Sequence, residues 1–98
     1  MIELQQLSLN PQDTGPELYG HRIAISEGFT GVARVVNEIR MVDLHLTLFR
    51  AFPGVDYPWY VEFVCKGESD RMERLRKRLY RIPSVVRIHC WRVASLPL

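Results

Sequence analysis

Residues 21–50 decide the fold, because the hydrophobic period changes twice along HRIAISEGFTGVARVVNEIRMVDLHLTLFR. Alternating apolar residues predict a strand over 21–26. Apolar residues then recur at intervals of three and four, which predicts an amphipathic helix over about 30–41. The residues of this stripe are Val32, Val35, Val36 and Ile39. Alternation returns over about 43–51 and predicts a second strand.

The rest of the chain repeats this pattern. Alternation predicts strands over about 58–66 and 85–93, and an apolar stripe between them predicts a helix over about 70–81. The stripe consists of Met72, Leu75 and Leu79. The resulting order is strand, helix, strand, strand, helix, strand. That order indicates an α+β, ferredoxin-like βαββαβ sandwich, in which a four-stranded antiparallel sheet carries two helices on one face.

Length and composition suit one folded domain of 98 residues. We expect the domain over 21–93, an amino-terminal extension over 1–20 and a tail over 94–98. The extension begins with spaced apolar residues that could form an extra strand or a clip on the sheet edge. Thirteen basic and eleven acidic residues leave a net charge of +2, which by itself does not indicate a nucleic-acid partner.

Cysteine and histidine usage indicates no cofactor or metal. The two cysteines, Cys65 and Cys90, form no CxxC pair, and no apolar run approaches the ~20 residues of a membrane helix. We therefore expect a cytoplasmic protein with two reduced thiols and no membrane segment. A metal site would need His21, His45 and His89 to converge, and the expected sheet order puts the last two on opposite edges.

The sheet face without helices is predicted to be partly apolar. Its expected apolar residues are Phe49, Tyr60, Val64, Val85 and Trp91. An apolar patch of this kind usually marks an interface. A second copy, the amino-terminal segment or stacked nucleobases could cover it. We favour the second copy, so a homodimer or higher homo-oligomer is expected and these five residues form its interface.

The combination of a strand, a GxxGVAR helix start, a second strand and an arginine-to-proline turn resembles ACT domains. These are βαββαβ regulatory modules that bind amino acids or other small metabolites at dimer interfaces. The resemblance covers about residues 21–93. The Gly-Val-Ala of residues 31–33 and the Arg-Ala-Phe-Pro of residues 50–53 resemble motifs of the prephenate dehydratase regulatory domain. The carboxy-terminal domain of stringent-response synthetases shares the general pattern.

The resemblance implies a ligand site at the turn between the first strand and the first helix, walled by a neighbouring copy. Its residues are Glu27, Gly28, Phe29, Gly31, Val32 and Ala33, with Arg50 and Pro53 from the neighbour. Free N–H groups at the helix start would attract a carboxylate, and Glu27 could meet an ammonium group. Alternatively, Gly28 and Gly31 only form the turn and pack the helix on the strand.

The expected function is a small regulatory module or subunit that self-associates, binds an amino acid or a similar metabolite between copies, and could act on a partner enzyme. A scaffold domain without a ligand is the first alternative. An RNA recognition motif has the same element order, but the first strand offers no aromatic residue for base stacking. An acylphosphatase would use the glycines and Arg34 of GFTGVAR, although the spacing departs from that family. No catalytic constellation stands out, so we expect no enzyme.

Overall fold

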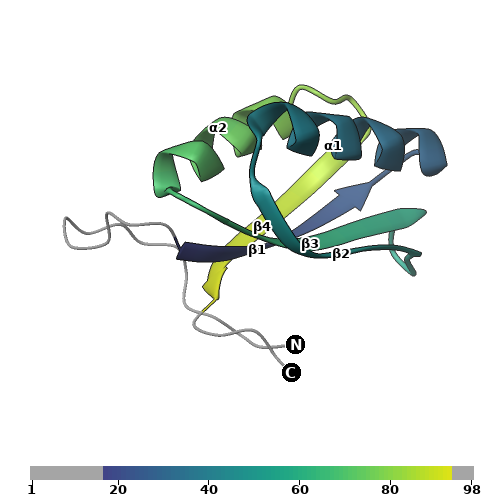
Figure 1. The fold of residues 1–98 in the computed structure, drawn as a ribbon. Helices are drawn as coiled ribbons and strands as arrows, with labels where there is room; N and C mark the ends of the chain where they lie inside the picture. The colour runs from purple at the N-terminus through teal and green to yellow at the C-terminus, as the bar shows by residue number, and fades with distance from the viewer. Residues whose placement is uncertain (1–16, 94–98) are drawn as a thin grey trace.

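Six elements follow one another in the predicted order (Figure 1). The structure is a computed structural model that describes residues 17–93. The strand or clip predicted near the amino terminus and the tail over 94–98 lie outside the described residues. The elements are β1 (Glu17–Ile25), α1 (Phe29–Val42), β2 (His45–Pro53), β3 (Trp59–Gly67), α2 (Ser69–Leu79) and β4 (Val85–Val93).

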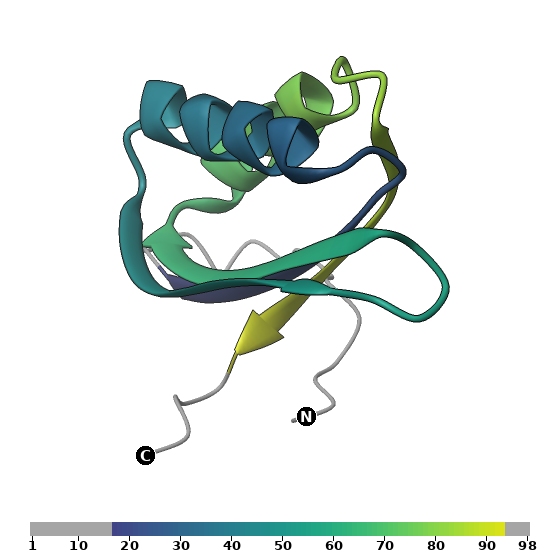
Figure 2. The same ribbon diagram turned by 90° about the vertical axis from the view of Figure 1, so that its right-hand side faces the viewer.

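The sheet order is β2-β3-β1-β4, and every neighbouring pair is antiparallel. Both helices lie on the same side of the sheet (Figures 1 and 2). The other side carries no helix or strand of residues 17–93 and is called the open face below. The predicted ferredoxin-like sandwich is therefore confirmed. Because β2 and β4 form the two edges, His45 and His89 lie on opposite edges of the sheet, as expected.

The core lies between the sheet and the helices. Both helices bury the predicted stripes, except that Val36 of α1 is 42% exposed. The core residues of the helices are Val32, Val35, Ile39, Val42, Met72, Leu75 and Leu79. Burial raises the pKa of Cys65 to about 12 and that of Cys90 to about 11, which keeps both thiols neutral. Both cysteines are free.

Strand β1 begins four residues earlier than predicted, at Glu17 rather than at residue 21. Tyr19 is fully buried in the core, and Gly20 lies under the indole ring of Trp91. A methyl group added at Gly20 would lie 2.5 Å from Trp91 Cε2. Gly20 is therefore a strand residue that permits a close side-chain approach, although the sequence analysis placed it in the amino-terminal extension.

Two interruptions of the strand register change the face of two residues. The pairs Leu46–Cys65 and Leu48–Val64 leave Thr47 as an extra residue in β2, and its hydroxyl donates to the carbonyl oxygen of Val64 at 3.1 Å. Because one extra residue reverses the alternation, Phe49 pairs with Phe63 on the helix side of the sheet. The prediction that Phe49 lies on the open face is wrong.

The second interruption lies in β4. Ile25 pairs with Val85 and Ala24 pairs with Arg87, which leaves Val86 as the extra residue. Val85 therefore points into the core, and Val86 is 44% exposed at the edge of the sheet. The prediction that Val85 lies on the open face is wrong for the same reason as for Phe49.

Candidate functional site

The predicted ligand turn connects β1 to α1. Gly28 is the N-cap residue of α1, and no side chain caps the helix there. Thr30 lies inside the first turn of the helix. The N–H of Gly31 donates to the carbonyl oxygen of Gly28 at 3.0 Å. The amide groups ahead of Gly31 thus lack a side-chain partner in the described part of the chain, as an anion site at a helix start requires.

Gly31 is a packing residue. A methyl group added there would lie 2.5 Å from Ile25 Cγ2 and 2.8 Å from Ser84 Oγ. The absence of a side chain therefore lets α1 approach the end of β1 and the start of β4. Val32 is also buried, so neither residue presents a side chain to a ligand. Gly28, by contrast, faces open space. These contacts support the packing interpretation of Gly31.

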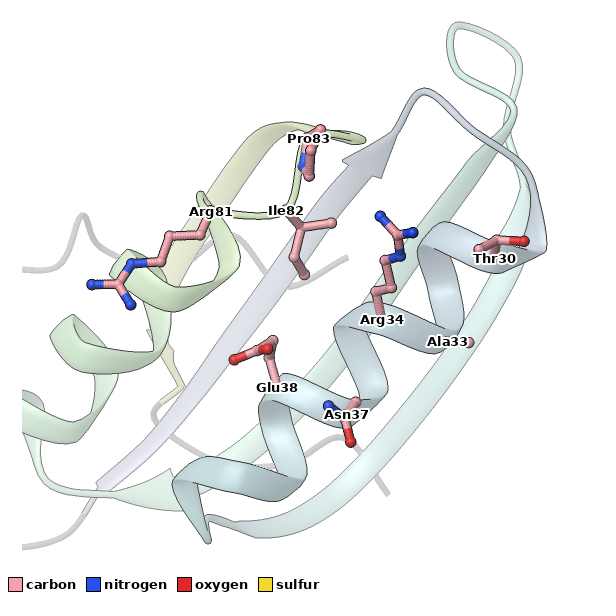
Figure 3. Close-up of a pocket in the computed structure, with 8 residues that line it drawn as sticks. All are labelled: Thr30, Ala33, Arg34, Asn37, Glu38, Arg81, Ile82 and Pro83. Atoms are coloured by element: carbon pink, nitrogen blue, oxygen red, sulfur yellow. The ribbon is translucent and has the colours of Figure 1, made fainter.

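The other residues predicted for the turn point in different directions. Glu27 is exposed, and Phe29 makes an edge-to-face contact with Trp59 at 5.9 Å between ring centroids. Ala33 lines a hollow of about 350 Å³ between α1 and the loop that follows α2 (Figure 3). In that view Arg34 extends toward Pro83, whereas the guanidinium group of Arg81 points away from it. The charged groups around this hollow do not converge on one point.

Arg50 and Pro53, predicted to act together, lie on different faces of the sheet. Arg50 pairs with Glu62 on the open face. Pro53 pairs with Trp59 on the helix side, at the sheet end where β1 leads into α1. Within one copy, Pro53 but not Arg50 therefore lies at the end of the sheet that carries the predicted turn. The wall predicted from a neighbouring copy stays a prediction.

The open face carries a charged network that the sequence analysis did not identify. Glu62 accepts hydrogen bonds from Nε of Arg50 at 2.7 Å and from Nε of Arg22 at 2.5 Å. Partial burial by itself would raise the pKa of Glu62, but the hydrogen bonds and charges of Arg50 and Arg22 outweigh it and lower that pKa. The alternation of HRIAIS, which places Arg22 opposite the core residues, was the available signal.

Aromatic rings adjoin this network. Tyr60 stacks on Phe52 at 5.7 Å between centroids and makes a T-shaped contact with Tyr57 at 6.0 Å between centroids. The guanidinium carbon of Arg50 lies 4.8 Å from the centre of the Phe52 ring. Of the five predicted interface residues, three lie on this open face. They are Tyr60, Val64 and Trp91. Because two apolar residues are turned away and the pairs of Glu62 with Arg22 and Arg50 lie there, the open face is more polar than predicted.

The most apolar exposed surface lies at the β2 edge. Leu46, Leu48 and Phe49 are each 39–49% exposed, with Leu48 on the open face and the other two on the helix side. On the helix side, an apolar groove of about 450 Å³ runs between β2 and α1. Val36 and Leu44 line it together with Leu46 and Phe49.

Residues 17–93 provide no candidate for a metal site or for a membrane-spanning helix. Within residues 17–93, no three histidine, cysteine or acidic side chains gather in a way that could hold a metal ion. Neither helix in that part of the chain is long and apolar enough to cross a membrane.

Comparisons with known proteins identify the fold. No protein-family model matches the sequence, and no curated protein matches it either. Solved structures are similar. The ACT domain of the GTP pyrophosphokinase from Chlorobium tepidum has a TM-score of 0.67 at 14% identity, over 76% of this chain and 97% of that one. An uncharacterized protein from Thermotoga maritima has a TM-score of 0.67 at 16% identity, over 80% and 98%.

A third similar structure is the P2 domain of the chemotaxis kinase CheA from Thermotoga maritima, solved in complex with the response regulator CheY. Its TM-score is 0.61 at 16% identity, over 81% of this chain and 100% of that one. At these identities the likeness concerns the fold alone. The chain has the fold of an ACT domain, as its sequence motifs predicted.

Proposed function

We propose that this chain is a regulatory module that works as a pair of copies joined along their β2 edges. The exposure of β2 carries this proposal. Three large apolar side chains of this strand are 39–49% exposed, and they lie on both of its faces. They are Leu46, Leu48 and Phe49. A long apolar edge strand is a liability that folded proteins normally cover.

A second copy is the occupant that the β2 edge favours. The free edge presents backbone N–H and C=O groups that another strand can pair with, and the same edge on a second copy satisfies this need about a two-fold axis. Arg50, the charged side chain in the middle of the strand, donates a hydrogen bond to Glu62 on the open face. Its guanidinium group therefore lies away from the edge where a second strand would pair. The groove beside β2 extends the apolar surface onto α1, so the contact would involve more than strand pairing.

A small metabolite such as an amino acid would bind where the two copies meet, near the turn between β1 and α1. The uncapped start of α1 supports this, because its free N–H groups favour a carboxylate. An antiparallel partner would bring the beginning of its own β2, near His45, toward this end of the sheet. We therefore assign the second wall of the ligand site to the beginning of the partner's β2, in place of Arg50 and Pro53.

Regulation would then follow from differential affinity. A ligand that bridges two copies binds the pair more tightly than the single copy and so shifts the association equilibrium. A partner enzyme that recognises one of the two states would respond to the ligand. The ACT-like fold supports this mode of action, since the modules that the sequence resembles act as dimers.

Light scattering tests the pairing. The wild-type protein should have a mass near 23 kDa, twice the 11.5 kDa of the chain. Leu48→Lys should give the single-chain mass with an unchanged circular dichroism spectrum, because a charge at this edge opposes pairing. Val86→Lys is the matched control, since Val86 is similarly exposed at the opposite edge, 44% against 49% for Leu48. A monomeric wild type, or dissociation by Val86→Lys instead, would contradict the proposal.

Thermal shift with each of the twenty amino acids tests the ligand. A saturating ligand at about 100 times its Kd stabilises the fold by about 2.7 kcal/mol. Stabilisation of the wild type but not of Leu48→Lys would support a site between copies. Equal stabilisation of both would place the site within one copy, and a dimer that no ligand stabilises would favour the scaffold alternative.

A further inference from the structure

The open face holds a hollow that neither the strand pairing nor the helix start uses. Its volume is about 370 Å³, within the usual size of small-molecule sites. It lies over the central strands, with Ala24 of β1 as its floor. Asp56 and Tyr57 of the β2–β3 loop line one side, so one carboxylate lines the hollow together with Arg22 and Arg87.

Cross-strand pairing creates the hollow. Ala24 pairs with Tyr60 on β3 and with Arg87 on β4, so these three side chains form a row across the open face. Neighbouring strands are about 4.8 Å apart, which separates the Cα atoms of Tyr60 and Arg87 by roughly 10 Å. Because only the small side chain of Ala24 stands between them, the space above it is empty.

One wall of the hollow is positively charged. Arg87 lines it and makes no hydrogen bond or ion pair with any residue in the described part of the chain. Arg22 also lines it and shares the single carboxylate of Glu62 with Arg50, which leaves that network with one excess positive charge. Two guanidinium groups beside one hollow match an oxyanion, since guanidinium binds carboxylate and phosphate groups with directed hydrogen bonds.

The opposite wall is aromatic and held in place. Tyr60 is fixed by its stack on Phe52 and by its T-shaped contact with Tyr57. The backbone of Gly54 lies directly against the ring, and a methyl group added at Gly54 would lie 2.1 Å from Tyr60 Cε2. An aromatic ring that is already immobilised can stack on a planar group at little further entropic cost.

We propose that this hollow binds a small molecule that carries one oxyanion, a carboxylate or a phosphate, and one planar ring. The oxyanion lies against Arg87 and Arg22, and the ring lies against Tyr60. An aromatic carboxylate and a mononucleotide share this chemistry. A long nucleic acid fits less well. The arginine-rich helix α2 lies on the other side of the sheet, so it cannot contact a nucleic acid that is bound to the open face (Figure 1).

The first experiment titrates the isotopically labelled full chain with benzoate, adenosine 5′-monophosphate and inorganic phosphate in separate series. We expect benzoate, the nucleotide or both to cause saturable amide shifts around Ala24, Tyr60 and Arg87, and phosphate alone to bind far more weakly. Saturation by benzoate alone identifies a carboxylate site, and saturation by the nucleotide alone identifies a phosphate site. Absence of saturable shifts with both, or shifts confined to α1, would overturn the proposal.

Variants separate this site from a general charge effect. Arg87→Ala should weaken binding about tenfold to hundredfold, as expected for one charge-assisted contact. Arg74→Ala is the matched control, because it removes the same charge from an exposed position on α2. Ala24→Leu keeps the charge and fills the hollow, so it should also weaken binding. Equal binding by wild type and Arg87→Ala would refute the assignment.

A single-stranded oligonucleotide series completes the test. Affinity that rises steadily with oligonucleotide length, with no saturable binding of the mononucleotide, would show a nucleic-acid surface and overturn the small-molecule site. The result does not depend on the oligomeric state, because the hollow lies within one copy. An experiment can therefore contradict the pairing at β2 without contradicting binding in this hollow, and the reverse also holds.

Discussion

A buried histidine ring should make the fold sensitive to mild acid. His21 is 1% exposed and stacks on Phe63, with ring centroids 4.5 Å apart and an interplanar angle of 8°. Neither ring nitrogen has a hydrogen-bond partner among the described residues. Burial therefore favours the neutral ring and lowers the pKa of His21 from 6.5 to about 3.

The sign and size of the effect follow from this shift. The unfolded chain binds a proton at His21 below about pH 6.5, while the folded chain does not until about pH 3, so stability falls as the pH drops through this window. About pH 5 lies some 1.5 units below the unfolded pKa. At about 1.4 kcal/mol per unit, His21 lowers the free energy of unfolding by roughly 2 kcal/mol between about pH 7.5 and about pH 5.

Urea denaturation at these two pH values measures the loss, which corresponds to a midpoint shift of roughly 1–2 M. His21→Phe should lack this loss and be at least as stable as the wild type near neutral pH, because an apolar ring leaves no buried nitrogen unpaired. His21→Leu serves if the larger ring does not fit. Glu62→Gln should keep the loss, since that carboxyl group titrates at lower pH. An equal acid sensitivity of His21→Phe and wild type would refute the reasoning.

Two further predictions concern the ligand turn and the open face. Gly31→Ala should destabilise the fold by about 1–3 kcal/mol, because the added methyl group meets Ile25 and Ser84; Gly28→Ala, in open space, should change the unfolding free energy by less than about 0.5 kcal/mol in the same chemical denaturation. Because the pKa of Glu62 is lowered, its carboxylate stabilises the fold at pH values above its ordinary pKa. This stabilisation is lost as the pH falls through the lowered pKa. Glu62→Gln should thus cost about 1 kcal/mol near neutral pH and flatten the acid limb of a stability–pH profile, and an unchanged limb would contradict the assigned pairing.

The structure also changes how the turn should be tested. Gly31→Asp would be a direct test of a ligand site at this turn if the variant left the fold intact. Because Gly31 packs against Ile25 and Ser84, a larger residue there perturbs the fold itself. A loss of ligand binding in that variant would not locate the site. Variants of exposed residues, such as Glu27, are the informative ones.

The element order could be predicted because each hydrophobic period depends only on near neighbours in the chain. The stripe of Met72, Leu75 and Leu79 faces the sheet as predicted. The faces of Phe49 and Val85 could not be predicted, because one unpaired residue reverses the alternation in each strand. Nothing in the local sequence marks Thr47 or Val86 as that residue, since no glycine or proline stands there.

The candidate sites, too, were predicted only in part from the sequence. The turn at the start of α1 was predicted from its glycines and from the resemblance to ACT domains. Its chemistry was not, because the contact of Gly31 with Ser84 joins residues from opposite ends of the domain. The hollow over Ala24 was not predicted at all, since its walls come from β3 and β4 and only the sheet register sets them opposite each other.

The sequence by itself determined the order of strands and helices, the helix faces that are buried and hence the α+β sandwich, because these depend on periods of two and 3.6 residues within single elements. The tertiary structure decided the rest. Pairing between distant strands placed the extra residues of β2 and β4, drew Arg22 and Arg50 onto one carboxylate, and left β2 exposed on both faces. Those features depend on the register in which distant strands pair, and no local pattern encodes that register.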